Sequence, residues 1–175
     1  MRILFFILIL ISSIDLSMQA QTDTTNNALT TFLIKAKVET YASGDESKVL
    51  KQNDGGKDIH YSSNDFRYRD RYYGELNFSG QELVWKNDSA YWSMNYFGIT
   101  NTAIRFPKDF PEFLKEALRN VPKEHPYRGP KYYESGDFKY TNDISGTLAN
   151  FHGVEKILFK NFEIYKLYYY GGYIH

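Results

Sequence analysis

Five short sequence patterns from the first half of this chain occur again in its second half, in the same order. The pairs are Phe32-Leu33-x-x-Ala36 with Phe113-Leu114-x-x-Ala117, Tyr61-x-x-Asn64-Asp65-Phe66-Arg67-Tyr68 with Tyr133-x-x-Gly136-Asp137-Phe138-Lys139-Tyr140, Gly74-x-Leu76 with Gly146-x-Leu148, Phe78-x-Gly80-x-Glu82 with Phe151-x-Gly153-x-Glu155, and Lys86-Asn87 before Tyr91 with Lys160-Asn161 before Tyr165. Ordered self-similarity of this kind indicates an internal repeat, here about residues 28–109 and 110–175. Each unit is too small to bury a sheet face alone, so we expect the two to share one core.

Each half begins with apolar residues at helical spacing. The stripe of the first predicted helix is Leu29, Phe32, Leu33, Ala36 and Thr40, and that of the second is Phe110, Phe113, Leu114, Ala117, Leu118 and Val121. Asp109 with Glu112 forms a capping-box pattern, Pro111 stands in the first turn, and Pro122 ends the second helix.

The apolar period changes from helical to two between His60 and Gly98, and again from Tyr132 to the C-terminus. Alternation with many aromatic residues predicts antiparallel strands, whereas the polar, glycine-rich residues 43–57 are predicted to be loop. The fold class is therefore α+β: two pseudo-repeated helix-plus-antiparallel-meander units that share one core, in a single domain over residues 28–175.

The N-terminus has the pattern of an export signal. Arg2 precedes nine apolar residues, Ile3 to Ile11, a run far shorter than the roughly 20 residues that a membrane-spanning helix needs. Polar and small residues follow, with Ala20-Gln21 as the expected cleavage point, although Met18 stands where a small residue is preferred. We expect residues 1–20 to be a signal peptide, residues 21–27 a polar leader, and the mature chain to be periplasmic or extracellular with no membrane span.

Composition excludes several classes of protein. The chain has no cysteine, which rules out disulfides, thiolate metal sites and a thiol nucleophile. Its four histidines are far apart with no metal-ligand spacing, and no phosphate-binding, dinucleotide or serine-hydrolase motif occurs, so we expect no metal and no cofactor. Balanced charges, 21 basic and 21 acidic, argue against nucleic-acid binding by the Arg67, Arg69 and Arg71 stripe, which we interpret as a solvated strand face.

Asp70 is the first candidate site residue. In the strand that begins at Phe66, it shares a face with Tyr68 and Tyr72, which places a carboxylate among aromatic rings. A buried carboxylate needs a donor or a wet cavity. Asn142 takes the corresponding place in the second half. The alternative is that Asp70 pairs with an arginine and only fixes the geometry of its strand.

Further candidates lie on the predicted hairpin Gln81 to Gly98 and after the second helix. The hairpin carries Trp85, Trp92, Asn95 and Tyr96, which could line a pocket for a sugar or a planar ligand or could simply be core. Arg128, in Tyr127-Arg128-Gly129-Pro130, is suited to clamping a carboxylate or phosphate, and Asp70 is a candidate partner.

The chain also resembles a bacterial family, domain of unknown function 5680, over about residues 30–174. The motifs that carry the resemblance are Phe32-Leu33-Ile34-Lys35-Ala36-Lys37 with Thr40-Tyr41-Ala42, Trp92-Ser93-Met94-Asn95-Tyr96-x-Gly98, Phe113-Leu114-Lys115-Glu116-Ala117-Leu118, Val121-Pro122 and Tyr127-Arg128-Gly129-Pro130. Members that stand behind helix-turn-helix regulators imply a sensing or ligand-binding module. The resemblance marks Asp70, Tyr72, Glu82, Asn95 and Arg128 as typical positions, whereas Tyr169-Tyr170-Gly171-Gly172 departs from the family's Phe-His-Gly-Gly.

Three functional hypotheses follow. The first is a non-enzymatic module that binds a small polar or aromatic ligand between its halves, with Asp70, Tyr72, Glu82, Trp92, Asn95, Tyr96 and Arg128 as site residues. The second is an interaction or immunity-type protein of the periplasm or cell surface, with a protein partner. The third is a hydrolase that uses the carboxylates of Asp70 and Glu82.

The export signal gives a direct prediction. N-terminal sequencing of the protein recovered from the periplasm or medium of its own host is expected to begin at Gln21, and an intact Met1 would refute the signal peptide.

Overall fold

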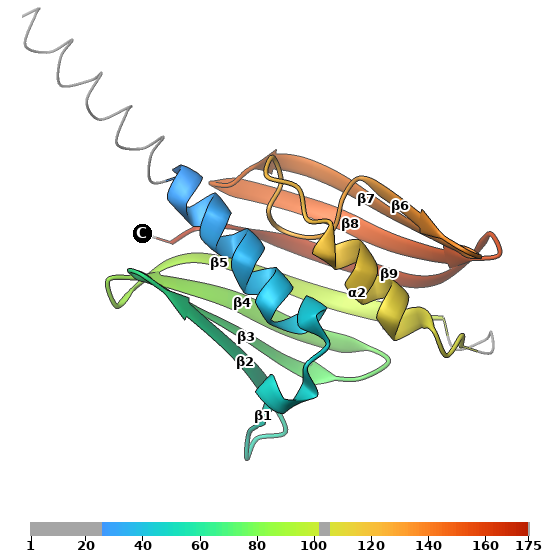
Figure 1. Cartoon of the computed structure of the whole chain (residues 1–175), viewed down its shortest axis with the longest axis horizontal. Coiled ribbons are helices and arrows are strands. Elements are labelled where there is room, and N and C mark those ends of the chain that lie inside the picture. Colours follow the sequence, from blue (N-terminus) through green and yellow to red (C-terminus); the bar gives the residue numbers. More distant parts are fainter. Residues whose placement is uncertain (1–25, 102–105, 175) are drawn as a thin grey trace, which may run out of the picture.

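The computed structural model describes residues 26–101 and 106–174, which form two α-helices and a nine-stranded antiparallel sheet (Figure 1). The helices span residues 26–39 and Phe110–Arg119 (α2). The strands are β1 (Leu50–Lys51), β2 (Lys57–Ser63), β3 (Phe66–Gly74), β4 (Phe78–Lys86), β5 (Ser89–Thr100), β6 (Tyr132–Ser135), β7 (Phe138–Thr147), β8 (Asn150–Phe159) and β9 (Phe162–Tyr173). The α+β class is confirmed, with strand as the dominant element.

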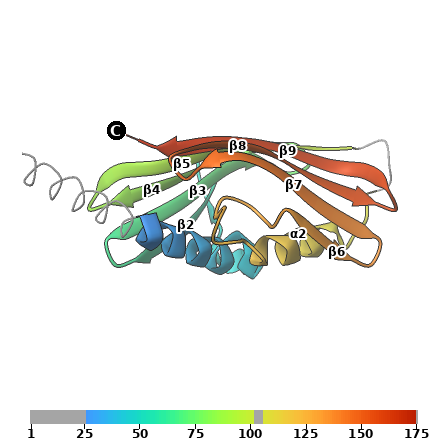
Figure 2. The ribbon, with the colours of Figure 1, turned by 90° about the horizontal axis from the view of Figure 1, so that it is seen from above.

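The strand order is β1-β2-β3-β4-β5-β9-β8-β7-β6, so two meanders meet edge to edge where β5 pairs with β9. Both helices lie on the same face of the sheet, which curves over them, while the other face is open (Figure 2). Joining two meanders gives each β5 and β9 edge a partner. The layer between the helices and the sheet therefore holds a single continuous core.

Each helix buries the stripe that its apolar spacing predicts. Leu29, Leu33 and Ala36 are inaccessible to solvent, and Phe113 and Leu114 of α2 are nearly so. The capping box at Asp109 does not form: its carboxylate makes no cap hydrogen bond. Asp109 has helical backbone angles, φ −84° and ψ −1°, instead of the extended conformation in which an N-cap side chain reaches back over the first turn.

Two boundaries differ from the sequence-based expectation. Residues 43–57 are not only loop. They begin in the 3₁₀ turn Tyr41–Ser43 (η1), contain the 3₁₀ turn Glu46–Lys48 (η2) and the short strand β1, and end at the first residue of β2. Residues 26 and 27 of the expected polar leader are helical. The Tyr173 hydroxyl donates a hydrogen bond to Asn26, a contact between distant parts of the chain that local sequence patterns cannot show.

The proposed signal peptide, residues 1–20, lies outside the described residues. Among the residues that are described, no helix combines the length and apolar composition needed to cross a lipid bilayer.

Two glycines let tyrosine rings lie flat against the sheet. A Cβ atom at Gly80 would stand 2.3 Å from the Tyr96 hydroxyl, and one at Gly153 would stand 2.3 Å from the Tyr169 hydroxyl. These distances are far below van der Waals contact. In both places the ring crosses its neighbour strand because the glycine has no side chain.

The Gly80 contact predicts a large effect of one methyl group. Gly80→Ala is expected to lower the free energy of unfolding by about 1–3 kcal/mol, because overpacking a well-packed core forces neighbouring groups to move. Urea denaturation would measure it. Ser79→Ala, on the exposed face of the same strand, is the control and is expected to change stability by less than about 0.5 kcal/mol; equal midpoints for the two variants would contradict the close packing.

Candidate functional site

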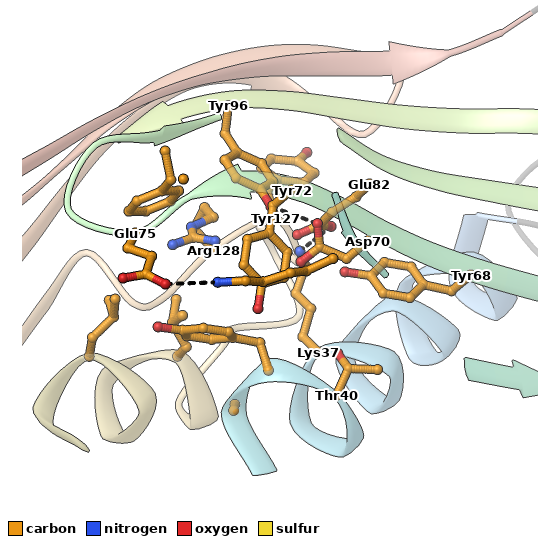
Figure 3. Close-up of a pocket in the computed structure, with 17 residues that line it drawn as sticks. Lys37, Thr40, Tyr68, Asp70, Tyr72, Glu75, Glu82, Tyr96, Tyr127 and Arg128 are labelled. Carbon is orange, nitrogen blue, oxygen red and sulfur yellow. Dashed lines mark hydrogen bonds and ion pairs between the residues drawn. The ribbon is translucent and has the colours of Figure 1, made fainter. Parts of the chain in front are cut away.

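A cavity of about 150 Å³ lies between the curved face of β3, β4 and β5 and the two helices (Figure 3). Its wall is mostly aromatic and apolar, with several charged groups turned inward. The residues that line it are Lys37, Thr40, Tyr41, Ala42, Lys57, Tyr68, Asp70, Tyr72, Gly74, Glu75, Phe78, Glu82, Tyr96, Leu114, Leu118, Tyr127 and Arg128. Five of the seven sequence-predicted site residues are in this set: Asp70, Tyr72, Glu82, Tyr96 and Arg128.

Asp70 lies on β3 with its carboxylate turned into the cavity (Figure 3). Its Oδ1 atom accepts a 2.6 Å hydrogen bond from the Tyr96 hydroxyl on β5. Among the described residues no arginine forms an ion pair with Asp70, so the alternative in which an arginine pairs with Asp70 and fixes its strand is not observed. Burial, and then the negative charge of Glu82, raise the pKa of Asp70 to about 7.

Glu82 is the direct cross-strand neighbour of Asp70, and it forms an ion pair with the amine of Lys37. The Lys37 Nζ to Glu82 Oε2 distance is 2.5 Å, and both side chains are buried. Burial lowers the pKa of Lys37 in spite of the attraction of Glu82. Lys37 was not predicted as a site residue, yet it stands four residues after Leu33, on the side of the helix that faces the sheet.

Arg128 clamps a carboxylate, as the sequence predicts, but the partner is Glu155 of β8 and not Asp70. Its Nε and Nη2 atoms lie 2.9 and 2.8 Å from the two Glu155 oxygens. The hydroxyls of Tyr140 and Tyr165 also donate to Glu155, at 2.6 and 2.9 Å. Burial alone would raise the pKa of Glu155, but Arg128 and these hydroxyls outweigh it, and the pKa is lowered.

Glu155 is not among the sequence-predicted site residues; in the sequence it stands out only as the counterpart of Glu82 in the matched patterns. The match of Phe78-x-Gly80-x-Glu82 with Phe151-x-Gly153-x-Glu155 is the sequence signal that points to Glu155, because it places the two glutamates at like positions. The arginine that pairs with Glu155 lies in a turn 27 residues away in sequence.

The cavity opens to solvent beside Lys57 and Glu75. Glu75 has a side chain 84% exposed, and its Oε1 atom lies 3.4 Å from Lys57 Nζ. The Lys57 amine also stands 5.6 Å from the centre of the Tyr72 ring, which is itself only partly buried. This ion pair and the Tyr72 ring therefore form the rim of the cavity.

Trp92 and Asn95 do not reach the cavity. Trp92 is fully buried, stacks on Phe151 with ring centres 5.5 Å apart, and donates its indole N–H to the Leu148 carbonyl. Asn95 lies on the opposite face of β5, where its amide oxygen accepts a hydrogen bond from Gln81. Three positions separate them, and side chains an odd number apart on a strand face opposite sides.

The arginine stripe of β3 lies on the open face of the sheet, away from the cavity. Arg71 makes a bidentate pair with Asp58, Arg67 pairs with the exposed Asp88, and both Arg67 and Arg69 lie over the Trp85 ring. Within the described part of the chain, no group of three or more His, Asp or Glu side chains could hold a metal ion.

A protein-family model, Domain of unknown function (DUF5680), matches residues 70–174. The chain belongs to this family. The matched DUF5680 segment begins at Asp70 and includes Glu82, Tyr96, Arg128 and Glu155, and thus most of the charged groups around the cavity. No curated protein and no solved structure matches the chain.

The raised pKa of Asp70 predicts an effect of pH on stability. Between its ordinary value of 3.8 and about 7, the folded protein holds a proton on Asp70 that the unfolded chain releases. The contribution of Asp70 to stability therefore falls as pH rises from about 4 to 7 and stays lost above. From pH 4 to pH 8, the wild type is expected to lose on the order of 2–4 kcal/mol more unfolding free energy than Asp70→Asn does.

Thermal or urea denaturation at both pH values would measure this difference. Asp143→Asn, an exposed carboxylate on β7, makes the same change in net charge and is the control. A parallel pH dependence of wild type and Asp70→Asn would contradict the burial of this proton.

The Arg128–Glu155 pair predicts strong coupling. Arg128→Ala is expected to cost about 3–5 kcal/mol of unfolding free energy, because it leaves a buried carboxylate without its cation. The same change in a Glu155→Gln background should cost much less. Lys156→Ala, which removes an exposed pair with Glu163 at 3.5 Å, should cost at most about 1 kcal/mol; equal costs of Arg128→Ala in both backgrounds would show that the pair is not the cause.

Proposed function

We propose that this DUF5680 member is a non-enzymatic module that binds a small molecule in the cavity between its sheet and its helices. The observation that carries the proposal is the cavity itself: an aromatic wall with a few buried polar groups converging on one space, which is the usual make-up of a ligand site. Its volume is about that of an engineered protein cavity that holds benzene, so the ligand is expected to be small.

The binding proposal is favoured over the hydrolase. Asp70 and Glu82 are adjacent on neighbouring strands, but Glu82 is held by Lys37 at 2.5 Å and both carboxylates are buried. Glycoside hydrolysis needs two carboxyl groups on either side of a sugar linkage. The space of about 150 Å³ beside these carboxylates is about that of one small ring, so the second ring of such a linkage would have to extend out of the cavity.

We also propose that the two halves are divergent repeats. Asp70 and Glu82 pair across β3 and β4 as Asn142 and Glu155 do across β7 and β8. Gly80 faces the Tyr96 ring as Gly153 faces the Tyr169 ring. Both hairpins carry a register shift, at Val84/Trp85 and at Ile157/Leu158. One of the five sequence matches is one residue out of register, since the left-handed turn residues are Asn87-Asp88 and Lys160-Asn161.

The halves differ where the cavity lies. The Tyr96 hydroxyl donates to Asp70, and the Tyr169 hydroxyl donates to Asn142. The Asn142 amide is further bonded to the Gly129 carbonyl at 3.1 Å, so the turn after α2 covers this place in the second half. We propose that the first half has kept the ligand site and the second supports it.

A second candidate, an interaction protein, is favoured by the open face of the sheet. Phe97 and Tyr168 are cross-strand neighbours on β5 and β9, each 48% exposed, and the nearby Tyr170 is 63% exposed. Exposed rings grouped at the centre of a sheet are typical of an interaction surface. Either function would be carried out after export, if residues 1–20 act as the signal that their sequence suggests.

Native mass spectrometry of the protein purified gently from its own host tests the binding proposal. A small extra mass is expected on the wild type and is expected to be lost in Ala42→Leu, because Ala42 lines the cavity and the larger side chain takes up its volume. Ala90→Leu, the same substitution at an exposed site, is the control. A protein adduct on all three would favour the interaction candidate, and a bare chain that also binds no small aromatic fragment in solution would refute the cavity as a ligand site.

A further inference from the structure

We propose that the cavity is built for a small organic cation: a protonated amine that contacts Asp70 and an apolar or aromatic body that fills the space between the rings. This inference rests on the proposed binding function and names the class of ligand. It is carried by the pairing of charges around the cavity.

Every charged side chain that lines the cavity, other than Asp70, has an ionic partner. Lys37 pairs with Glu82 at 2.5 Å, Lys57 with Glu75 at 3.4 Å, and Arg128 with Glu155 at 2.8 Å. Each of these pairs is neutral by itself. Asp70 is left over, because no lysine, arginine or histidine among the described residues lies within ion-pair distance of it.

The Asp70 carboxylate also has unused hydrogen-bonding capacity. A carboxylate accepts up to about four hydrogen bonds. Asp70 accepts one from the Tyr96 hydroxyl on Oδ1, and the described residues give its Oδ2 atom none. A buried carboxylate in this state favours either a proton or a ligand that brings both a positive charge and N–H donors.

The rings around Asp70 suit a cation as well. The cavity is lined by Tyr68, Tyr72, Phe78, Tyr96 and Tyr127, and aromatic faces attract positive charge within about 6 Å of their centres. The protein already uses this attraction at the same wall. The Lys57 amine lies 5.6 Å from the Tyr72 ring centre and the Arg128 guanidinium 6.0 Å from that of Tyr96.

Anionic and neutral ligands fit less well. An anion would add a charge to the three buried carboxylates of Asp70, Glu82 and Glu155, which have only Lys37 and Arg128 to balance them. A neutral ligand would leave Asp70 to take up a proton. A cation replaces that proton, so the affinity for the cation rises with pH. The groups that face Asp70 from the helix, β4, β5 and the turn after α2 keep their pairing; they are Lys37, Glu82, Tyr96 and Arg128.

Calorimetry with three probes of one shape tests the inference: benzylamine, benzyl alcohol and benzoate, each at pH 6 and pH 8. Benzylamine is expected to bind most tightly and about tenfold more tightly at pH 8 than at pH 6, since the ionised fraction of a group with a pKa of about 7 changes by that factor. Benzyl alcohol is expected to bind weakly and without this pH dependence, and benzoate not at all.

Asp70→Asn is the decisive variant. Asn142, which accepts the Tyr169 hydroxyl at 2.9 Å, shows that this fold accommodates an amide at the corresponding place, so the variant is expected to fold. It should weaken benzylamine binding at pH 8 at least tenfold and abolish its pH dependence, whereas Asp143→Asn should change neither. Unchanged benzylamine affinity in Asp70→Asn, or equal binding of benzylamine and benzyl alcohol, would overturn the inference.

The outcomes separate the ligand class from the binding function. If probes bind the wild type but not Ala42→Leu, and Asp70→Asn has no effect, the cavity is a ligand site and the cationic class is wrong. If no probe binds and a neutral or anionic molecule co-purifies with the chain, the class is again wrong and the function stands. If no probe binds and nothing co-purifies, both are refuted.

Discussion

Glu155 is inaccessible to solvent, and the need to neutralise it organises much of this protein. A carboxylate in that position is tolerated only with a cation and donors around it. Arg128 and the hydroxyls of Tyr140 and Tyr165 supply them, and Arg128 brings with it the turn after α2. Tyr127 of that turn stacks on Phe151 with ring centres 3.8 Å apart. One buried charge thus fixes the segment that forms part of the cavity wall.

The cavity is linked to how the first half neutralises its own buried glutamate, Glu82. In the first half, Glu82 is paired with Lys37 from the helix over residues 26–39 and not with an arginine from a turn. Among the described residues, the Gly129 carbonyl that binds Asn142 has no counterpart at Asp70, whose carboxylate faces a cavity between the two helices, three strands and the rim pair of Lys57 and Glu75. A change from amide to carboxylate at this position turns a structural hydrogen-bond acceptor into a group that needs a counter-charge.

The sequence was sufficient to predict the two helices, the two strand-rich regions and the inner face of β3, but not the short strand β1 or the two 3₁₀ turns. Period-two spacing placed Tyr68, Asp70 and Tyr72 together on the inner face of β3, where they lie. The same period-two spacing puts Trp92 and Asn95 on opposite faces of their strand, so the hypothesis that both line one pocket is inconsistent with the spacing. The partner of Arg128 was beyond reach, because choosing between Asp70 and Glu155 depends on how the turn crosses the sheet. The failed cap at Asp109 depends likewise on the backbone angles of Asp109, which the capping-box pattern does not specify.

The central position of β9 has a consequence for the order in which the protein can form. Of the nine strands, β9 is synthesised last, yet it fills the gap between β5 and β8. Until it arrives, both meanders have a bare strand edge of the kind that pairs with other chains. The seam of the sheet therefore closes only after β9 has been synthesised, and a chain kept unfolded up to that point avoids exposing two open edges.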